Sequence, residues 1–441
     1  MPDLPRFALG TVQPEAELCP VLWGLLDTLE RLGWHVQSFQ STAQLSPVCG
    51  VRCITGQSQR HLDSWMMSRA TCREIFAHGS KASDISIVEG HFDSAKRTEQ
   101  KSSLNTLCQW LDLPQIVVID VQKIDGCRLP ALPLGAAGLL LDRVRDSADG
   151  IRWQTWLEAR YGVPVLGFLN RASKIRSLIG AREAGSPCRE LCRALGERFE
   201  PTLKLQQLLK IAQSQPWQAS APRLFAPASE NDQITVAVAF DEAFQGYFAD
   251  TLDLLEARGA RICDFSPLRS EALPWDTDIV YLAGLHSEQH ALALSRNICL
   301  KQSLRNFVAQ GGRVYAEGSG LAYLCEQMVL PDGRVFPMAG LLPAIAHSKS
   351  MHGALHPVET TFGPHVWLGA PGTKMRGYVD NAWELEPAPE LGRCIVENDH
   401  CHDVVAAGRV IGSRMQVDLA GQPHLLASFF RPRLDALVEI D

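Results

Sequence analysis

Apolar residues in the first 140 positions recur in short runs separated by amphipathic stretches. Runs at 85–88, 116–119 and 138–141 are typical of parallel strands buried on both faces. Phe7-Ala8-Leu9 predicts a further short strand, and the apolar positions of 21–32 repeat with helical spacing up to a glycine. Strands that alternate with helices predict a doubly wound α/β domain.

The same alternation begins again after residue 233. Strand-like runs at 234–238 and 279–282 flank a helical stretch near 252–258, and a third run leads into residues 314–321. The last hundred residues contain shorter β-like runs and more turns. The pattern therefore predicts a second α/β domain.

A stretch rich in Ser, Pro, Ala and Gln separates the two patterns. It covers residues 214–232 and is typical of a linker. The expected domains are therefore 1–213 and 233–441. A chain of 441 residues is long enough for two such domains.

Composition excludes several classes of protein. Apolar residues make up 46% of the chain, and 42 Lys and Arg stand against 49 Asp and Glu, for a net charge of -7. This balance argues against a nucleic-acid partner, which would need a basic face. No apolar run has the length of a membrane span, and the N-terminus lacks the features of a secretion signal, so we expect a cytoplasmic protein without a membrane partner. Its thirteen cysteines are then expected to be mostly reduced thiols.

Residues 314–321, Val-Tyr-Ala-Glu-Gly-Ser-Gly-Leu, have the outline of a nucleophile elbow. Such an elbow is a strand, a tight turn and a helix that together hold a reactive side chain above the end of a parallel sheet. A cysteine or serine is expected at the apex, but this chain has Gly318, which carries no side chain. The sequence predicts the architecture of an active site without its nucleophile.

Two nearby residues could substitute for the missing nucleophile. Cys325 is expected in the helix after the elbow, where its thiol would point into packing. Ser319 lies one residue beyond the apex, but Glu317 and Leu321 stand where a Gly-x-Ser-x-Gly motif has glycines. A solvent-facing or backbone-bonded Ser319 is favoured, and a serine hydrolase that uses Ser319 remains an alternative.

A histidine-rich segment near residue 400 contains the side chains that zinc prefers. His400, Cys401 and His402 could bind a metal, but structural zinc sites usually combine ligand pairs from two separate segments. We therefore interpret the segment as a polar loop and expect no metal. The pairs Cys49-x3-Cys53 and Cys188-x3-Cys192 are equally weak signals.

Both halves of the chain contain short segments that match one known family in their order and spacing. In the second half, they include Ala243-Phe244, Gly259-Ala260, Phe265-Ser266-Pro267-Leu268, Tyr315-Ala316-Glu317 and Gly340-Leu341-Leu342-Pro343. In the first half, they are His61-Leu62-Asp63-Ser64-Trp65-Met66 and Val88-Glu89-Gly90. With these segments, the chain resembles the cobyrinic acid a,c-diamide synthase family along nearly its whole length. The resemblance implies a P-loop-NTPase-like (dethiobiotin-synthetase-like) amide-forming domain, followed by a flavodoxin-like class I glutamine amidotransferase domain.

The resemblance also implies an ATP-binding P-loop, and here the chain departs from it. The aligned stretch runs from Gly10 and Thr11 to Cys19. Glu17 stands where a P-loop has the lysine that neutralises the phosphates, and Leu18 cannot coordinate a metal ion. Pro14 has no backbone N–H to donate to a phosphate. A carboxylate at ~4 Å from a phosphate repels it by about 1 kcal/mol in water and more where buried. We expect no nucleotide here and interpret Pro14 to Glu17 as an ordinary first helical turn.

The amidotransferase residues that the resemblance implies are also replaced. The family's cysteine aligns with Gly318, and its His-x-His pair aligns with Arg431 and Arg433 on an expected terminal strand, 426–433. An arginine stays protonated and cannot act as a general base. A protein of this kind is expected to lack glutaminase activity.

The leading hypothesis is a homologue without catalysis, cofactor or metal. It would bind a tetrapyrrole-like or carboxylated small molecule, or act with an active homologue or a second copy of itself. The expected ligand contacts are His61, Asp63, Trp65 and Glu89; the structural alternative makes Trp65 part of the core and Asp63 the cap of the following helix. An amide-forming ligase of the cobalamin pathway that uses Mg-ATP and free ammonia remains an alternative function.

Overall fold

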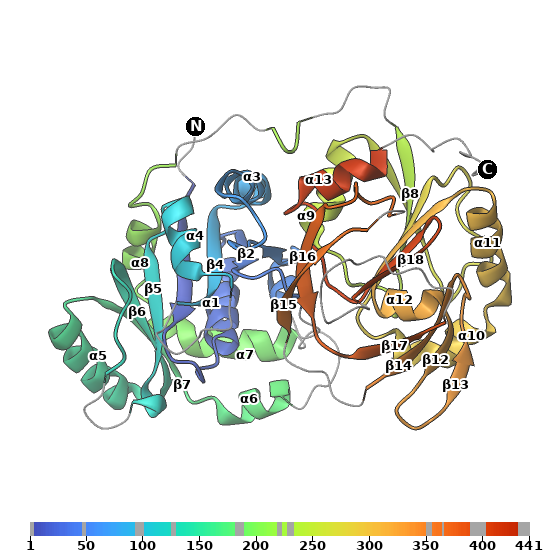
Figure 1. Ribbon diagram of the computed structural model, residues 1–441. Helices are drawn as coiled ribbons and strands as arrows, with labels where there is room; N and C mark the ends of the chain where they lie inside the picture. Colours follow the sequence, from blue (N-terminus) through green and yellow to red (C-terminus); the bar gives the residue numbers. More distant parts are fainter. Residues whose placement is uncertain are drawn as a thin grey trace. The chain divides into compact units, whose positions relative to one another are not determined.

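The chain folds into two compact units, and each is described here by itself. The computed structural model describes residues 4–45, 50–92, 101–124, 129–180, 189–217, 223–226, 233–349, 355–363, 366–388 and 403–430. Unit 1 comprises residues 1–42 and 46–222, and unit 2 comprises residues 43–45 and 223–441. Both units are of the α/β class, as the apolar pattern predicted (Figure 1).

Unit 1 is built on a seven-stranded sheet in which all strands run parallel, in the order β3-β2-β4-β1-β5-β6-β7. The four apolar runs predicted as strands form β1, β4, β5 and β6. The strands are β1 (Arg6–Thr11), β2 (Val36–Gln40), β3 (Arg60–His61), β4 (Ile85–His91), β5 (Gln115–Asp120), β6 (Ala136–Val144) and β7 (Val165–Asn170).

Helices cover both faces of this sheet. The helices are α1 (Cys19–Arg31), α2 (Val51–Thr55), α3 (Arg69–Gly79), α4 (Leu104–Leu111), α5 (Ser147–Tyr161), α6 (Ser173–Gly180), α7 (Arg189–Phe199) and α8 (Leu205–Ala212). Side chains of α1, α2, α7 and α8 form one apolar core with the sheet, while α4 packs on β1 and β4. The predicted first helix is confirmed as α1, which begins two residues earlier than expected.

Unit 2 contains a six-stranded sheet in the order β18-β19-β11-β10-β8-β9. All its neighbours pair in parallel except β18 with β19. The strands are β8 (Ile234–Ala239), β9 (Ala260–Phe265), β10 (Ile279–Gly284), β11 (Arg313–Gly318), β18 (Val404–Ala407) and β19 (Val410–Ser413). The helices α9 (Ala249–Ala257), α10 (Ala291–Arg296), α11 (Ile298–Ala309), α12 (Ser319–Leu324) and α13 (Pro423–Leu426) complete the unit.

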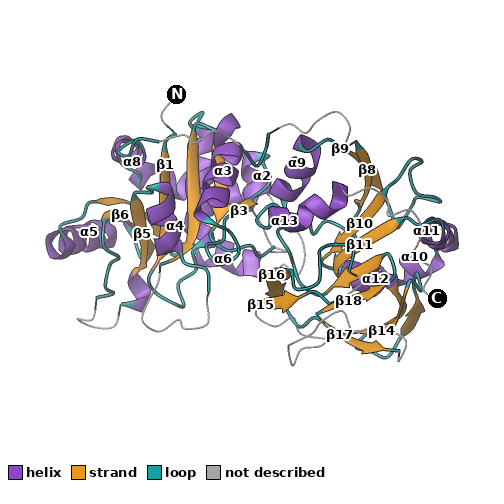
Figure 2. Cartoon of the chain, turned by 45° about the horizontal axis from the view of Figure 1, so that its top comes forward, coloured by secondary structure: helices purple, strands orange, loops and turns teal. Residues whose placement is uncertain are grey.

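Two smaller sheets account for the β-rich end of the chain that the sequence predicted. One has the order β13-β12-β14-β17, and the other is the hairpin β15-β16 (Figure 2). Their strands are β12 (Cys325–Val329), β13 (Val335–Pro337), β14 (Leu342–Ser348), β15 (His356–Thr361), β16 (Lys374–Val379) and β17 (Trp383–Pro387).

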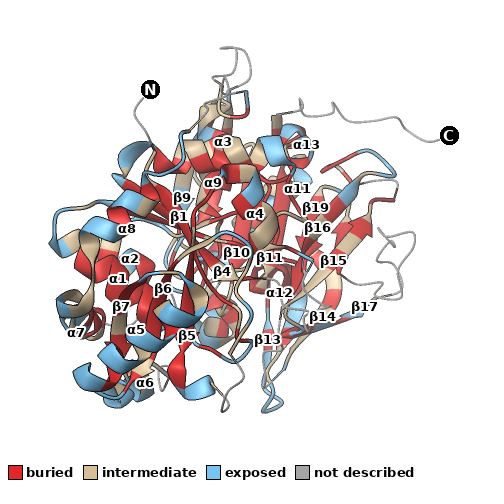
Figure 3. Cartoon of the chain, turned by 90° about the vertical axis from the view of Figure 1, so that its left-hand side faces the viewer, coloured by how far each residue is buried: buried red, intermediate tan, exposed pale blue. Residues whose placement is uncertain are grey.

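Central strands of both large sheets, such as β1 and β5 in unit 1 and β10 and β11 in unit 2, are almost completely buried (Figure 3). The carboxyl ends of parallel strands lie at one edge of a sheet, where open α/β sheets place their ligand sites. In the described part of the chain, no helix is long and apolar enough to cross a membrane. Among the eight cysteines described there, no disulfide forms.

Candidate functional site

The elbow at the carboxyl end of β11 has the sharp backbone turn that the sequence predicted. Gly318 ends β11 with φ +56° and ψ -126°, and α12 begins at the next residue. This left-handed conformation is strained for a residue that has a side chain. A Cβ built on Gly318 would also lie 2.5 Å from the carbonyl oxygen of Gly284, on neighbouring β10. The turn is therefore preserved, but the space for a nucleophile's side chain is closed.

Neither substitute nucleophile is placed to react. Ser319 is 1% exposed, and its Oγ accepts a hydrogen bond from the backbone N–H of Ser287 at 3.1 Å. The structure thus favours the backbone-bonded interpretation over the serine hydrolase. The helix after the elbow ends at Leu324, so Cys325 begins β12 rather than lying in that helix. Its thiol is buried as expected, and burial raises its pKa to about 12, far from the range of a reactive thiolate.

Glu317 lies directly before the apex, and its pKa is raised more than that of any other Asp or Glu of unit 2 that the structure describes. It is 2% exposed, and burial raises the pKa of its carboxyl group to about 8. Its Oε1 accepts from the Tyr281 hydroxyl at 3.0 Å, and its Oε2 accepts from Val417 N at 3.0 Å. At pH 7 the carboxyl group of Glu317 is therefore mostly protonated and uncharged. Its hydrogen bond with Val417 N holds the segment after β19 against the elbow.

The expected terminal strand at 426–433 is wrong as far as it can be followed. Residues up to Phe430 form α13 and the 3-10 turn Ala427–Phe430, because Pro423 can open a helix and the apolar residues after it pack as one face. Arg431 and Arg433 lie outside the described residues. The segment that does pass the elbow contains Gln416 and Asp418, on either side of Val417, and no histidine.

Gln416 and Asp418 have the same spacing as the pair expected to supply a base, and sequence comparison missed them. The Oδ1 atom of Asp418 accepts from Ala420 N at 3.0 Å and from the Thr251 hydroxyl at 3.2 Å. The Oε1 atom of Gln416 accepts from Leu45 N at 2.8 Å. Both side chains therefore hold backbone in place. The loop after β10 also contains His286, with Nδ1 3.5 Å from Glu288.

In unit 1, the loop between β1 and α1 is not a helical turn. Helix α1 begins only at Cys19, so the interpretation of Pro14 to Glu17 as a first helical turn is wrong. The loop is instead fixed by its own groups: Gln13 N donates to the Thr11 hydroxyl, and Ala16 N donates to the carbonyl of Gln13, each at 3.1 Å. A phosphate loop directs such amides at its ligand, whereas here they are used within the chain.

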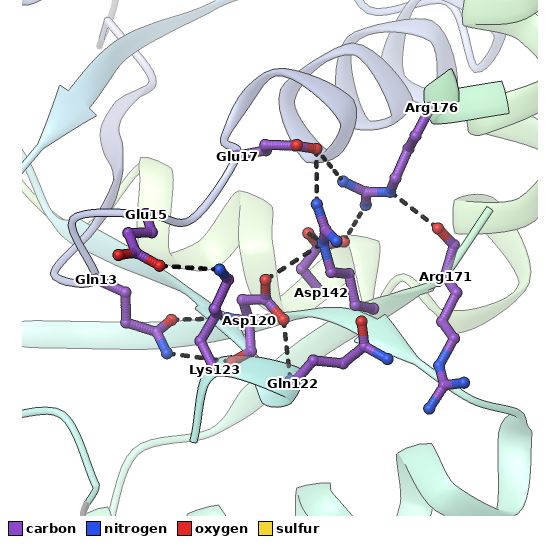
Figure 4. A network of polar contacts seen from close by, with 10 residues as sticks. Gln13, Glu15, Glu17, Asp120, Gln122, Lys123, Asp142, Arg171 and Arg176 are labelled. Carbon is purple, nitrogen blue, oxygen red and sulfur yellow. Dashed lines mark hydrogen bonds and ion pairs between the residues drawn. The ribbon is translucent and has the colours of Figure 1, made fainter. Parts of the chain in front are cut away.

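Glu17 is held by Arg143, near the carboxyl end of β6, and by Arg176, on helix α6, whose pairing with Glu17 is drawn in Figure 4. Its Oε2 lies 2.8 Å from Arg143 Nη2 and 3.2 Å from Arg176 Nη1. Arg176 also pairs with buried Asp142, and Arg143 Nε lies 3.3 Å from buried Asp120. Burial raises the pKa of Asp142 to about 6, while Arg176 opposes that rise.

Two further contacts link the same loop to β5. The Gln13 side chain donates to the carbonyl of Asp120 at 3.1 Å and accepts from Asp120 N at 2.8 Å. Glu15 pairs with Lys123 at 3.1 Å (Figure 4). The loop thus brings two carboxylates to a sheet edge that already has two, and the four pair with only three cations. A polyphosphate would have to displace Glu17 and face the remaining carboxylates, so these residues do not fit Mg-ATP held by a P-loop.

The expected ligand residues of unit 1 fall into two groups. Asp63 is 0% exposed, and its Oδ1 accepts from Trp65 N at 2.9 Å and from Met66 N at 3.0 Å. It caps a turn at 64–66, not a helix, because α3 begins at Arg69 with Ser68 as its own cap. Half-buried Trp65 faces the ammonium of Lys101 at 4.8 Å from its ring centre.

His61 ends β3, and Glu89 lies near the carboxyl end of β4. Both are placed beside Gln40 by strand register, His61 from β3 and Glu89 from β4. Glu89 is 9% exposed and accepts a hydrogen bond from the Gln59 amide, and burial raises its pKa to about 7. The structure brings these two residues to one edge, with Asp63 two residues after His61.

The described part of the chain contains no group of three or more His, Cys, Asp or Glu side chains arranged to hold a metal ion. His400, Cys401 and His402 lie outside the described residues, as do Cys49 and Cys188.

Comparison with known proteins finds relatives whose similarity extends over residues of both units. Residues 235–378 match the model of the CobB/CobQ-like glutamine amidotransferase domain. A cobyrinate a,c-diamide synthase of Dehalococcoides mccartyi is 26% identical over 97% of this chain and 94% of its own length. One from Syntrophotalea carbinolica is 29% identical over 85% of each chain. One from Synechocystis is 30% identical over 78% of this chain and 75% of its own length.

The chain belongs to the cobyrinate a,c-diamide synthase family. The resemblance identified from the sequence is therefore confirmed. Within this cobyrinate a,c-diamide synthase homologue, sequence reasoning missed the two arginines that bind Glu17. Asp142-Arg143 directly follows a predicted strand, which could have indicated a polar side chain at its carboxyl end. Arg176 carries no such signal, because its neighbours in space are distant in sequence.

Proposed function

We propose that this member of the family has lost glutamine hydrolysis and P-loop ATP chemistry, and acts by binding a ligand. One observation carries the proposal: an elbow with the nucleophile's backbone conformation has a glycine at its apex, and the place of a Cβ lies 2.5 Å from a carbonyl oxygen. Acyl transfer from glutamine by this route needs a thiolate and a base to activate it. The described segment beside the elbow contains no cysteine or histidine, and its Asp418 already accepts hydrogen bonds from Ala420 N and the Thr251 hydroxyl.

The nucleotide half of the proposal rests on the loop before α1. Glu17 pairs with Arg143 and Arg176, and the amides of Gln13 and Ala16 bond within the loop. Phosphate binding would require breaking these contacts and placing negative charge next to Asp120 and Asp142. With both reactive centres lost, ligand binding is the activity that the remaining geometry supports.

The relatives' name indicates the class of ligand: a corrinoid precursor with several carboxylate groups. We infer that His61 and Glu89 contact such a ligand. With its pKa near 7, Glu89 can present a neutral carboxyl group that donates to a ligand carboxylate, while Gln59 holds its other oxygen. Asp63 shapes the same edge through the turn that it caps.

Calorimetric titration with cobyrinate tests the binding role. Binding should weaken by up to about tenfold between pH 6 and pH 8, because deprotonated Glu89 would repel the ligand's carboxylates. The variant Glu89→Gln should lose this pH dependence, since its amide does not titrate. Asp63→Asn is the matched control, because its oxygen can still accept the turn hydrogen bonds. Absence of binding, or an identical pH profile in Glu89→Gln, would refute the role given to Glu89.

A further inference from the structure

Two guanidinium groups from different elements converge on a single oxygen atom. Arg143 at the end of β6 and Arg176 on α6 both direct N–H groups at Oε2 of Glu17, at 2.8 and 3.2 Å. The arginine side chains are 23% and 9% exposed, whereas Glu17 is 56% exposed. The two donors are therefore largely enclosed, and the carboxylate that fills the space between them comes from the solvent side.

Contacts other than Glu17 hold both arginines in place. Arg176 pairs with Asp142, which is 1% exposed, and its Nε donates to the carbonyl of Arg171 at 2.9 Å. Arg143 faces Asp120, which is 0% exposed, at 3.3 Å. Removing Glu17 would leave the inner contacts of both guanidinium groups intact, so their outer N–H groups would stay aimed at the same point.

The backbone at Arg143 gives independent support. Arg143 has φ +57°, and the pairing of β6 with β7 shifts register between Leu141 and Val144. A residue with a side chain adopts this conformation at a cost on the order of 1 kcal/mol or more. The bulge turns Arg143 toward Asp120 and Glu17, and bulges of this kind commonly redirect a side chain next to a functional site.

We propose that Arg143 and Arg176 form a preorganised oxyanion site that Glu17 keeps closed as an internal ligand. The site suits a phosphate-type or carboxylate oxygen, because two charge-assisted donors meet at one acceptor. An external oxyanion gains access only when the loop at 12–18 withdraws Glu17. This proposal rests on the proposed function in one respect, namely that the wild-type loop does not take a nucleotide.

Titration with inorganic pyrophosphate at pH 7.5 tests the closed site. Glu17→Ala should bind pyrophosphate about tenfold or more tightly than the wild type, because the donors are exposed and the competing carboxylate is gone. Glu15→Ala is the matched control: it makes the same change in charge two residues away, but Glu15 pairs with Lys123 instead. It should alter affinity by less than about twofold, as expected for a screened surface charge.

A second substitution locates the binding. Arg143→Gly in the Glu17→Ala background removes one donor and relieves the left-handed backbone at that residue, and the affinity of the folded double variant should return to the wild-type value. If folded Glu17→Ala binds no better than the wild type, or if Glu15→Ala gains as much, the proposal is wrong. Tight pyrophosphate binding by the wild type would contradict the closed site, whereas ADP formation from Mg-ATP by the wild type would contradict the proposed function, so the two claims fail separately.

Discussion

Arg176→Ala should destabilise unit 1 by about 3–5 kcal/mol at pH 8, the usual consequence of removing one partner from a buried ion pair. Asp142, 1% exposed, would lose the cation that opposes its desolvation, and Glu17 would lose one of its two partners. The loss should be smaller at pH 5, because Asp142 has a pKa near 6 and is then mostly protonated even in the folded wild type. The free energy of opening of β5 and β6, from amide hydrogen exchange, measures the effect.

Arg193→Ala is the control for this substitution. Arg193 pairs with Glu197 on the surface of α7, with both side chains more than half exposed, so the change should stay within about 0.5 kcal/mol. Equal effects of the two variants would show that the network at the carboxyl end of β6 contributes little to stability.

The stability of unit 2 should fall as pH rises from about 4.5 to about 8, with Glu317 as a main cause. The pKa of Glu317 in the folded state is raised above its value of about 4.5 in the unfolded state. Between the two values, Glu317 is ionised in the unfolded state but still protonated in the folded state, so rising pH favours the unfolded state. The slope from one such group approaches ~1.4 kcal/mol per pH unit between the two pKa values and vanishes above the higher one.

Glu317→Gln should remove this slope. An amide can accept from Val417 N and donate to the Tyr281 oxygen, so the variant should be similar to the wild type at pH 4.5 and more stable at pH 8. Exchange of β10 and β11 amides, corrected for intrinsic exchange rates, gives the comparison. Exposed Glu326→Gln serves as the control, and a parallel pH profile for the wild type and Glu317→Gln would rule out an ionisable Glu317 as the source.

Local patterns in the sequence were sufficient to predict most strands of the two large sheets. Buried parallel strands consist of apolar runs, and so β1, β4, β5, β6, β8, β10 and β11 followed from the residues. Strand β2 was missed because Val36 to Gln40 has only two apolar residues, which neither form a run nor alternate with polar ones, and β3 was missed because it has only two residues. Pro14 to Glu17 were wrongly interpreted as a helical turn because Glu15 and Glu17 suit a helix dipole, while in the structure they form ion pairs.

The candidate sites could be predicted only in part, for a physical reason. Gly318 lies inside a local motif, so its position at the turn followed from eight residues. The partners of Glu17 are residues 126 and 159 positions further along, and no local pattern connects them. Likewise, only strand pairing shows that Val417 reaches Glu317.

The most direct test of lost chemistry is an assay of the purified protein with cobyrinate, Mg-ATP and either glutamine or ammonia, following glutamate release, ADP formation and the amide product. The account predicts none of the three above background, for the wild type and also for Gly318→Cys, because the new thiol would be crowded by Gly284 and would have no base. Amide formation with ammonia would contradict the loss of ATP chemistry. Glutamate release by the wild type would contradict the loss of the amidotransferase site.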